Sequence, residues 1–147
     1  MNDSFNPAPP QATRILLVDA NVSVRERCAA LLQRAGYRVD AQNGAAAGWQ
    51  AVRENGYDLL VIDYQLPGGS GLRLIARIRT AHITLPVILL AETALADELD
   101  RNPRLRLSAT INRPFTAEQL LETAVAVLQN SRPNTVDSQS LVLIGCD

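Results

Sequence analysis

DLLVIDYQLPGGSG, residues 58–71, is the stretch of this chain that decides its fold. Its four apolar residues, 59–62, contain no breaker and lead directly into Asp63. A short apolar run bounded by turn residues is typical of a strand covered on both faces, as in a parallel sheet. Such a strand carries Asp63 to its C-terminal end, where open α/β sheets place their ligand crevice. On position alone, Asp63 is either a nucleophile or metal ligand, or a polar residue that merely ends a strand.

Four further apolar segments of strand length alternate with helical patterns along the chain. We predict these strands at residues 14–18, 37–41, 85–90 and 107–112. Helices are predicted from position 21 or 23 to 35, over 45–54, over 72–78, over 93–101 and from 116 onwards. Strands that alternate with helices in this way predict an α/β fold, a doubly wound five-stranded parallel sheet with right-handed crossovers.

Two helix starts carry capping signals. Asn21 or Ser23 can cap the first helix, and Ser23 with Glu26 has the spacing of a capping box. Thr116 and Gln119 have the same spacing at the start of the last helix. We therefore expect side chains to bind the free backbone N–H groups at both places.

The length and the net charge of the chain limit the functions that it can have. The chain has 147 residues, enough for one domain with a substantial core. Its 14 basic and 15 acidic residues nearly cancel, so charge gives no sign of a nucleic-acid partner. It shows no secretory signal and no apolar run of about 20 residues. We expect a cytoplasmic protein that binds neither nucleic acid nor a membrane.

Three residues that could carry chemistry have simpler explanations. Cys28 and Cys146 lack the spacing of a metal site and are too few for a disulfide framework. Cys28 also lies on the apolar stripe of the first helix, where we expect a small core residue. Trp49, the only tryptophan, is expected to be a packing residue or a partly covered surface residue.

The two ends of the chain differ in character from its middle. Residues 1–13 contain three prolines among small and polar residues, which indicates a flexible leader before a folded domain at 14–130. Residues 131–147 form a polar linker and an apolar tail. The run Leu141–Ile144 could add an edge strand, pair with a second copy in a homodimer, begin another domain, or fray.

Four positions that are distant in the sequence follow or end predicted strands. They are Asp19, Asp63, Ala91 and Arg113. Because the C-terminal ends of parallel strands meet at one edge of a sheet, these positions are expected to converge on one crevice.

These residues and their order resemble the receiver domains of two-component response regulators, over about residues 14–130. The likeness is carried by Ile15-Leu16-Leu17-Val18-Asp19, by Asp63-Tyr64-Gln65-Leu66-Pro67 with Gly71, and by Arg113-Pro114-Phe115. The resemblance implies flavodoxin-like topology. It also implies a histidine kinase or phosphotransfer protein that phosphorylates Asp63, and a downstream effector protein that recognises the resulting change of shape.

The resemblance further implies a Mg²⁺ ion held by Asp19, by Asp63 and by the backbone carbonyl of Gln65. A hydroxyl on the fourth strand and a lysine on the fifth would then contact the phosphoryl group. These two positions are Ala91 and Arg113 here. Phosphoryl transfer concentrates negative charge, which a cation and a fixed positive side chain offset.

The chain departs from this pattern at three places. The second residue of the expected acidic pair is Ala20, so we expect weak Mg²⁺ binding. Ala91 has no hydroxyl to donate. Arg113 keeps the positive charge of lysine but is longer and planar, and it could pair with Asp63 directly and bidentately.

Two functions therefore remain, and neither makes the chain an enzyme. The first is a phosphorelay receiver in which Asp63 is phosphorylated weakly or atypically. The second is a phosphorylation-independent pseudo-receiver that serves as a protein interaction module. Other phosphate-binding folds fit less well, because the chain has Asn21 where a haloacid-dehalogenase-type phosphotransferase needs aspartate, and no Gly-rich or Ser/Thr-rich loop follows the first strand.

Overall fold

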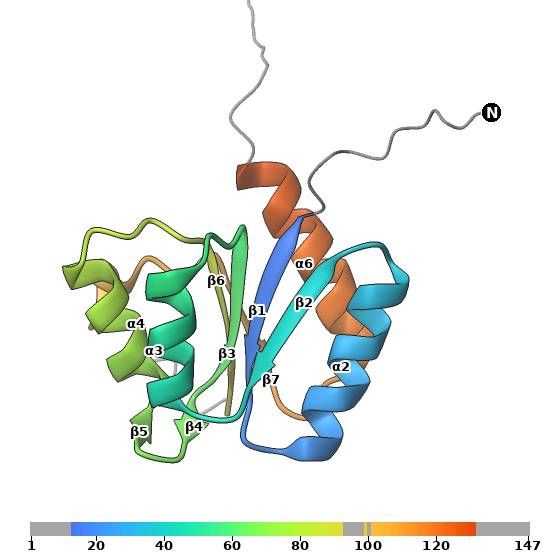
Figure 1. Ribbon diagram of the computed structural model, residues 1–147, viewed down its shortest axis with the longest axis horizontal. Coiled ribbons are helices and arrows are strands. Elements are labelled where there is room, and N and C mark those ends of the chain that lie inside the picture. The colour runs from blue at the N-terminus through green and yellow to red at the C-terminus, as the bar shows by residue number, and fades with distance from the viewer. Residues whose placement is uncertain (1–12, 93–98, 100, 132–147) are drawn as a thin grey trace, which may run out of the picture.

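A computed structural model describes residues 13–92, 99 and 101–131 (Figure 1). Its main sheet has five parallel strands in the order β2-β1-β3-β6-β7. The strands are β1 (Arg14–Val18), β2 (Arg38–Gln42), β3 (Leu59–Asp63), β6 (Val87–Ala91) and β7 (Ala109–Asn112). This is the predicted doubly wound parallel sheet with flavodoxin-like topology.

Helices cover both faces of the sheet. The α2 and α6 helices lie on one face, and α3 and α4 lie on the other (Figure 1). Their bounds are α2 (Val22–Arg34), α3 (Ala45–Glu54), α4 (Gly71–Thr80) and α6 (Ala117–Ser131), with a short 3-10 helix η2 (Pro103–Leu105). The helix predicted over 93–101 falls almost entirely outside the described residues.

The two helical layers explain why the central strands are continuously apolar. Apart from Arg14, every residue of β1, β3 and β6 is buried. In β3, Leu60 and Ile62 belong to the core under α3 and α4, whereas Leu59 and Val61 belong to the core under α2 and α6. Both faces of the strand therefore need apolar side chains, as is typical of parallel sheets.

The helix caps confirm one prediction and correct another. The side chain of Asn21 accepts a hydrogen bond of 3.0 Å from the backbone N–H of Val24, so α2 begins at Val22. The predicted capping box of Ser23 and Glu26 is wrong, because Ser23 already lies inside the first turn. The second predicted capping box, at the start of α6, is present. The backbone N–H of Thr116 donates to the side chain of Gln119 at 2.8 Å, and the backbone N–H of Gln119 donates to the side chain of Thr116 at 3.0 Å.

Three strands begin later than predicted. Strand β6 starts at Val87 rather than residue 85, and the carbonyl of Pro86 accepts a 2.9 Å bond from the N–H of Leu60. Strand β7 starts at Ala109 rather than residue 107. Arg79 holds the segment before β7, because its Nε donates to the carbonyl of Leu105 at 2.8 Å and its Nη2 to that of Arg106 at 3.2 Å. The second strand is also displaced by one residue, to Arg38–Gln42.

Some sequence predictions fall at the ends of the chain. The leader before Thr13 and the tail after Ser131 lie outside the described residues, so the flexible leader and the role of the apolar tail stay predictions. Cys28 is a buried core residue, as predicted, and its burial raises the pKa of the thiol. None of the described helices combines the length and apolarity needed to cross a membrane.

Candidate functional site

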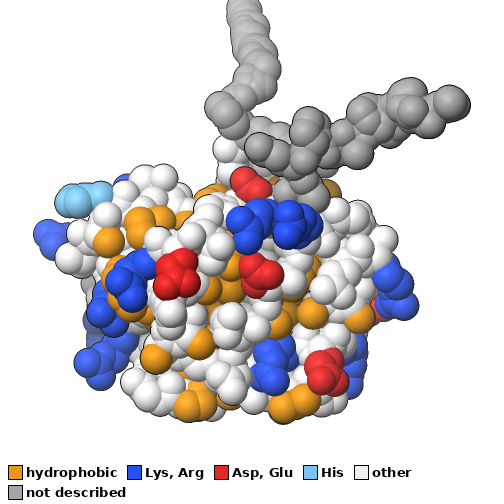
Figure 2. Space-filling view, in the orientation of Figure 1, with side chains coloured by type: hydrophobic (Ala, Val, Ile, Leu, Met, Phe, Trp, Pro, Cys, Tyr) orange, Lys and Arg blue, Asp and Glu red, His pale blue; other side chains and the backbone are white. Residues whose placement is uncertain are grey.

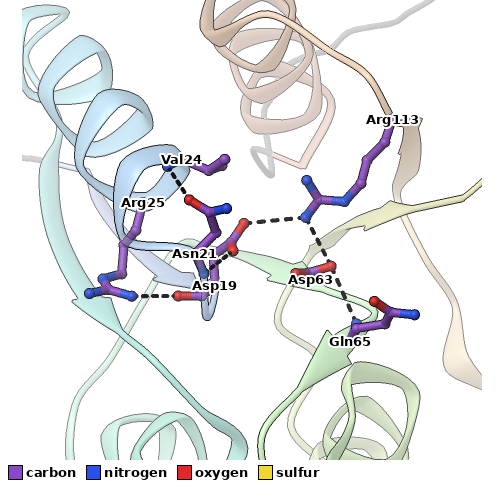
Figure 3. A network of polar contacts seen from close by, with 7 residues as sticks. All are labelled: Asp19, Asn21, Val24, Arg25, Asp63, Gln65 and Arg113. Atoms are coloured by element: carbon purple, nitrogen blue, oxygen red, sulfur yellow. Dashed lines mark hydrogen bonds and ion pairs between the residues drawn. The ribbon is translucent and has the colours of Figure 1, made fainter.

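Four neighbouring strands deliver the predicted site residues to one edge of the sheet. Asp19 follows β1, Asp63 ends β3, Ala91 ends β6 and Arg113 follows β7. Asp19, Asp63 and Arg113 point toward one another, although they come from three different strands (Figure 3). The side chains of Asp19, Asp63 and Arg113 therefore converge as predicted, and Ala91 ends the strand between those that carry Asp63 and Arg113.

Arg113 bridges the two carboxylates. Its Nη2 atom lies 3.0 Å from Oδ1 of Asp63 and 3.4 Å from Oδ2 of Asp19 (Figure 3). Its backbone N–H donates to the carbonyl of Ala91 at 3.0 Å, which anchors the arginine to the end of β6. The pairing with Asp63 that we expected does occur, but it is not bidentate. One nitrogen is shared between Asp19 and Asp63 instead.

Asp19 is a fully buried carboxylate with fixed partners. Its Oδ1 accepts a 2.9 Å bond from the backbone N–H of Asn21. Burial raises the pKa of Asp19, and the negative charge of Asp63 adds to this effect. The bond from Asn21 and the positive charge of Arg113 oppose it only in part. Ionisation of Asp19 in the folded protein therefore costs free energy, and the positive charge of Arg113 reduces this cost.

The same arrangement stabilises the positive charge of Arg113. Burial by itself would lower the pKa of Arg113, but the hydrogen bond and charge of Asp63, followed by those of Asp19, outweigh burial and raise it. The guanidinium also lies 5.5 Å from the ring centre of Phe115. The site therefore contains a permanently charged cation between two carboxylates.

The loop after β3 fixes the backbone around Asp63. Asp63 is 8% exposed as a whole residue, and its Oδ1 also accepts a 3.3 Å bond from the N–H of Gln65. The N–H of Gly71 donates to the carbonyl of Tyr64 at 2.6 Å, so the start of α4 packs directly against β3. A side chain at position 71 would collide with the backbone carbonyl of Asp63. Gly71 is therefore a spacing requirement of the site and not only a turn residue.

Residues 15–125 match the family of the response regulator receiver domain. The chain belongs to this family. The match confirms the family that the sequence resembled, and it covers most of the folded part of the chain.

Relatives of known sequence agree with this assignment. The phosphate regulon transcriptional regulatory protein PhoB of Pseudomonas aeruginosa is 31% identical over 134 residues, which are 89% of this chain and 57% of PhoB. The transcriptional regulatory protein DltR of Streptococcus agalactiae is 36% identical over 110 residues, 74% of this chain and 48% of DltR. The chain thus spans about half the length of these curated relatives.

Solved structures agree as well. The non-phosphorylated receiver domain of HemR from Leptospira biflexa has a TM-score of 0.76 and 30% identity, over 84% of this chain and 99% of that one. The chemotaxis response regulator CheY4 of Vibrio cholerae has a TM-score of 0.73 at 21% identity, over 80% and 99% of the two chains. At that identity, the second comparison supports the fold alone.

Alanine occupies two positions at which the family resemblance led us to expect a polar side chain. Ala20 is exposed and Ala91 is 1% exposed, and each ends in a methyl group. Neither side chain can ligate a metal or donate a hydrogen bond. Thr93, the next hydroxyl along the chain after Ala91, lies outside the described residues.

The oxygen atoms at this site of the receiver domain are only partly suited to bind Mg²⁺. Carboxylates and a backbone carbonyl are the ligands that Mg²⁺ prefers, and Asp19, Asp63 and Gln65 offer them. However, Arg113 lies against both carboxylates. In the part of the chain that the structure describes, no three His, Cys, Asp or Glu residues are grouped to hold a metal. The arrangement fits a guanidinium between the carboxylates better than it fits a metal ion.

Two contacts at the site were missed by sequence reasoning. Nη1 of Arg25 donates to the backbone carbonyl of Asp19 at 2.7 Å, and the N–H of Asn21 binds the Asp19 carboxylate (Figure 3). Both groups lie within six positions of Asp19 in the sequence. The periodicity of α2 places Arg25 on a helix, but it does not reveal that the helix turns this side chain back to the end of β1.

Proposed function

We propose that this receiver domain works in a two-component phosphorelay, with Asp63 as a phosphoacceptor that is phosphorylated weakly. The observation that carries the proposal is the shared Nη2 of Arg113, which lies 3.0 Å from the acceptor carboxylate. The proposal includes a histidine kinase or phosphotransfer protein as donor, a downstream effector protein, and a cytoplasmic location.

The two oxygens of Asp63 differ in their surroundings. The contacts that described residues make to this carboxylate, from Gln65 and from Arg113, both fall on Oδ1. Oδ2 is therefore the oxygen left to attack a phosphoryl group. The ion pair withdraws charge from the carboxylate and makes it a weaker nucleophile. Arg113 already lies against Asp63, so its positive charge is placed to offset the negative charge of a phosphoryl group there.

Phosphorylation is expected to be slow but specific for Asp63. The protein is incubated with acetyl phosphate and Mg²⁺, and the intact mass is followed with time. We expect a partial adduct of one phosphoryl group that is absent from Asp63→Ala. Asp58→Ala is the matched control, because Asp58 is an exposed aspartate just before the same strand. The absence of any adduct at every Mg²⁺ concentration would refute phosphorylation of Asp63.

Weak Mg²⁺ binding is expected to improve when the residues around the two carboxylates are changed. Arg113→Lys removes the planar fork from the carboxylates, and Ala20→Asp adds an oxygen donor. Each change is expected to raise Mg²⁺ affinity by about tenfold, as measured by isothermal titration calorimetry. Unchanged affinity in both variants would show that neither Arg113 nor Ala20 limits metal binding.

The alternative function is a pseudo-receiver that binds its partner without phosphorylation. The absence of a hydroxyl at Ala91 favours it, because a phosphoryl group on Asp63 would lack a usual contact on β6. The two functions differ in the effect of the phosphodonor. A partner that binds wild type and Asp63→Asn equally well, with or without acetyl phosphate, would support the pseudo-receiver.

A further inference from the structure

The face formed by α3 and α4 combines an aromatic side chain with arginines. Trp49 on α3 is half-buried against the core. The guanidinium of Arg77 lies 4.3 Å from its ring centre, and that of Arg53 lies 5.6 Å from it. Figure 2 shows basic side chains gathered along the edge of the molecule that α4 and α3 form. This face, defined by Arg53, Trp49, Arg73 and Arg77, is called the α3–α4 face below.

A hollow of about 270 Å³ opens on the α3–α4 face. Its wall includes Arg73 and Arg77 of α4, the turn at residues 68–70, and the small residues Ala45 and Ala46 at the start of α3. The lining contains no acidic side chain. Both arginines are exposed, and no described carboxylate lies within ion-pair distance of either.

The arginines of α4 are placed where they repel one another. The α4 sequence GLRLIARIRT has three arginines and no acidic residue. Arg73 lies in the first turn, near the positive end of the helix dipole. Arg73 and Arg77 are four positions apart, so these like charges are neighbours on the helix surface. An anion in the hollow would remove both repulsions.

Within the part of the chain that the structure describes, the other charged groups near this face do not neutralise it. Arg79 is turned away, because its guanidinium binds backbone carbonyls that include that of Ile83 at 2.9 Å. The only acidic residue of α3 is Glu54, whose carboxylate accepts a 3.1 Å bond from Gln50. The guanidinium groups of Arg73 and Arg77 are therefore available to a ligand.

The shape and composition of the face indicate a protein ligand. The hollow is smaller than the roughly 300–1,000 Å³ of most small-molecule sites, and the arginines extend beyond it to Arg53, across Trp49. Tryptophan and arginine are the residues that most often dominate protein–protein binding energy. A net charge of −1 for the whole chain does not favour nucleic acid. We propose that the α3–α4 face binds an acidic segment of a partner protein, with Arg73, Arg77 and Trp49 as its main contacts.

This interaction goes beyond the proposed function and does not depend on phosphorylation of Asp63. Hexaglutamate serves as the probe, and the fluorescence of Trp49, the only tryptophan, reports its binding. Backbone amide chemical shifts in ¹⁵N NMR spectra give a second measurement. We expect saturable binding that weakens as the ionic strength rises. Asp63→Asn is expected to bind as wild type does, which separates this proposal from the proposed function.

Charge changes on α4 test the named contacts. The double variant Arg73→Gln/Arg77→Gln is expected to weaken hexaglutamate binding by about tenfold or more. Arg34→Gln on α2 is the matched control, because Arg34 is also an exposed helical arginine, and it is expected to leave binding unchanged. Equal weakening in both would show a nonspecific charge effect and overturn the proposal. Shift changes confined to other elements, or tighter binding of an oligothymidylate than of hexaglutamate, would overturn it as well.

Discussion

Arg113→Met is expected to lower the free energy of unfolding at pH 7 by about 2 kcal/mol, as measured by urea denaturation. The substitution keeps much of the side-chain volume and removes the charge. It leaves Asp19, which is fully buried, and Asp63, which is 8% exposed, without the cation that lies between them. Removing one partner of a buried ion pair costs up to about 5 kcal/mol, and the partial exposure of Arg113 reduces that figure.

The stability that Arg113→Met loses is expected to depend on pH in a defined direction. The pKa of Asp19 is raised above 3.8 by burial, so the folded state binds this proton more tightly than the unfolded chain does. Stability therefore falls as the pH rises from about 3.8 through the folded-state pKa of Asp19. Arg113 lowers that pKa, so Arg113→Met extends the fall to higher pH. The variant should lose less stability at pH 4 than at pH 7.

Two further variants test this explanation. Arg113→Lys retains a positive charge and is expected to lose less stability than Arg113→Met. Asp19→Asn combined with Arg113→Met is expected to recover part of the loss, because the neutral amide needs no cation. A loss for Arg113→Met that is the same at pH 4 and pH 7, and that Asp19→Asn does not reduce, would show that the effect is one of packing.

Gly71→Ala is expected to destabilise the fold by about 3 kcal/mol. A methyl group at this position would collide with the backbone carbonyl of Asp63. The obstacle is backbone, so it cannot rotate aside as a flexible side chain would. Either α4 or the end of β3 must move. We therefore also expect changed amide chemical shifts at Asp63 and Gln65, together with the fall in thermal stability.

Gly56→Ala is the matched control. A Cβ atom at Gly56 would meet no atom within 4 Å, and the residue does not require a positive φ. Its stability is expected to stay the same or to rise by less than about 1 kcal/mol, because alanine restricts the unfolded chain. Similar losses in the two variants would show that general flexibility, and not contact with Asp63, is responsible for the effect at position 71.

The composition of the chain accounts for an arginine, and not a lysine, at position 113. All 14 basic residues of this chain are arginines. An arginine on the fifth strand is thus what the composition alone would supply, and its presence does not by itself signal a new role. The structure adds the consequence, since the long side chain reaches from beyond β7 to carboxylates at the ends of β3 and β1. The arginine that stands where the resemblance predicts a lysine therefore forms an internal ion pair.

Local signals explain where sequence reasoning succeeded. Strands β1, β3 and β6 are continuous apolar runs because helices cover both of their faces, and this pattern is visible without a structure. The helix Ala45–Glu54 agrees with its predicted bounds, since Gly44 and Asn55 flank a run of good helix formers. Where two caps competed, at Asn21 and Ser23, spacing alone could not choose between them.

The sequence by itself determined the order of the elements, the parallel sheet and the placement of Asp19, Asp63, Ala91 and Arg113 at strand ends. Periodicity and the handedness of crossovers are sufficient for that, because they depend on local pattern and topology. Only the tertiary structure decided that one nitrogen of Arg113 is shared by two carboxylates, and that Gly71 must lack a side chain. Arg113 and Asp19 are 94 positions apart, and a difference of less than 1 Å between such groups decides which contact forms. No sequence pattern specifies distances on that scale.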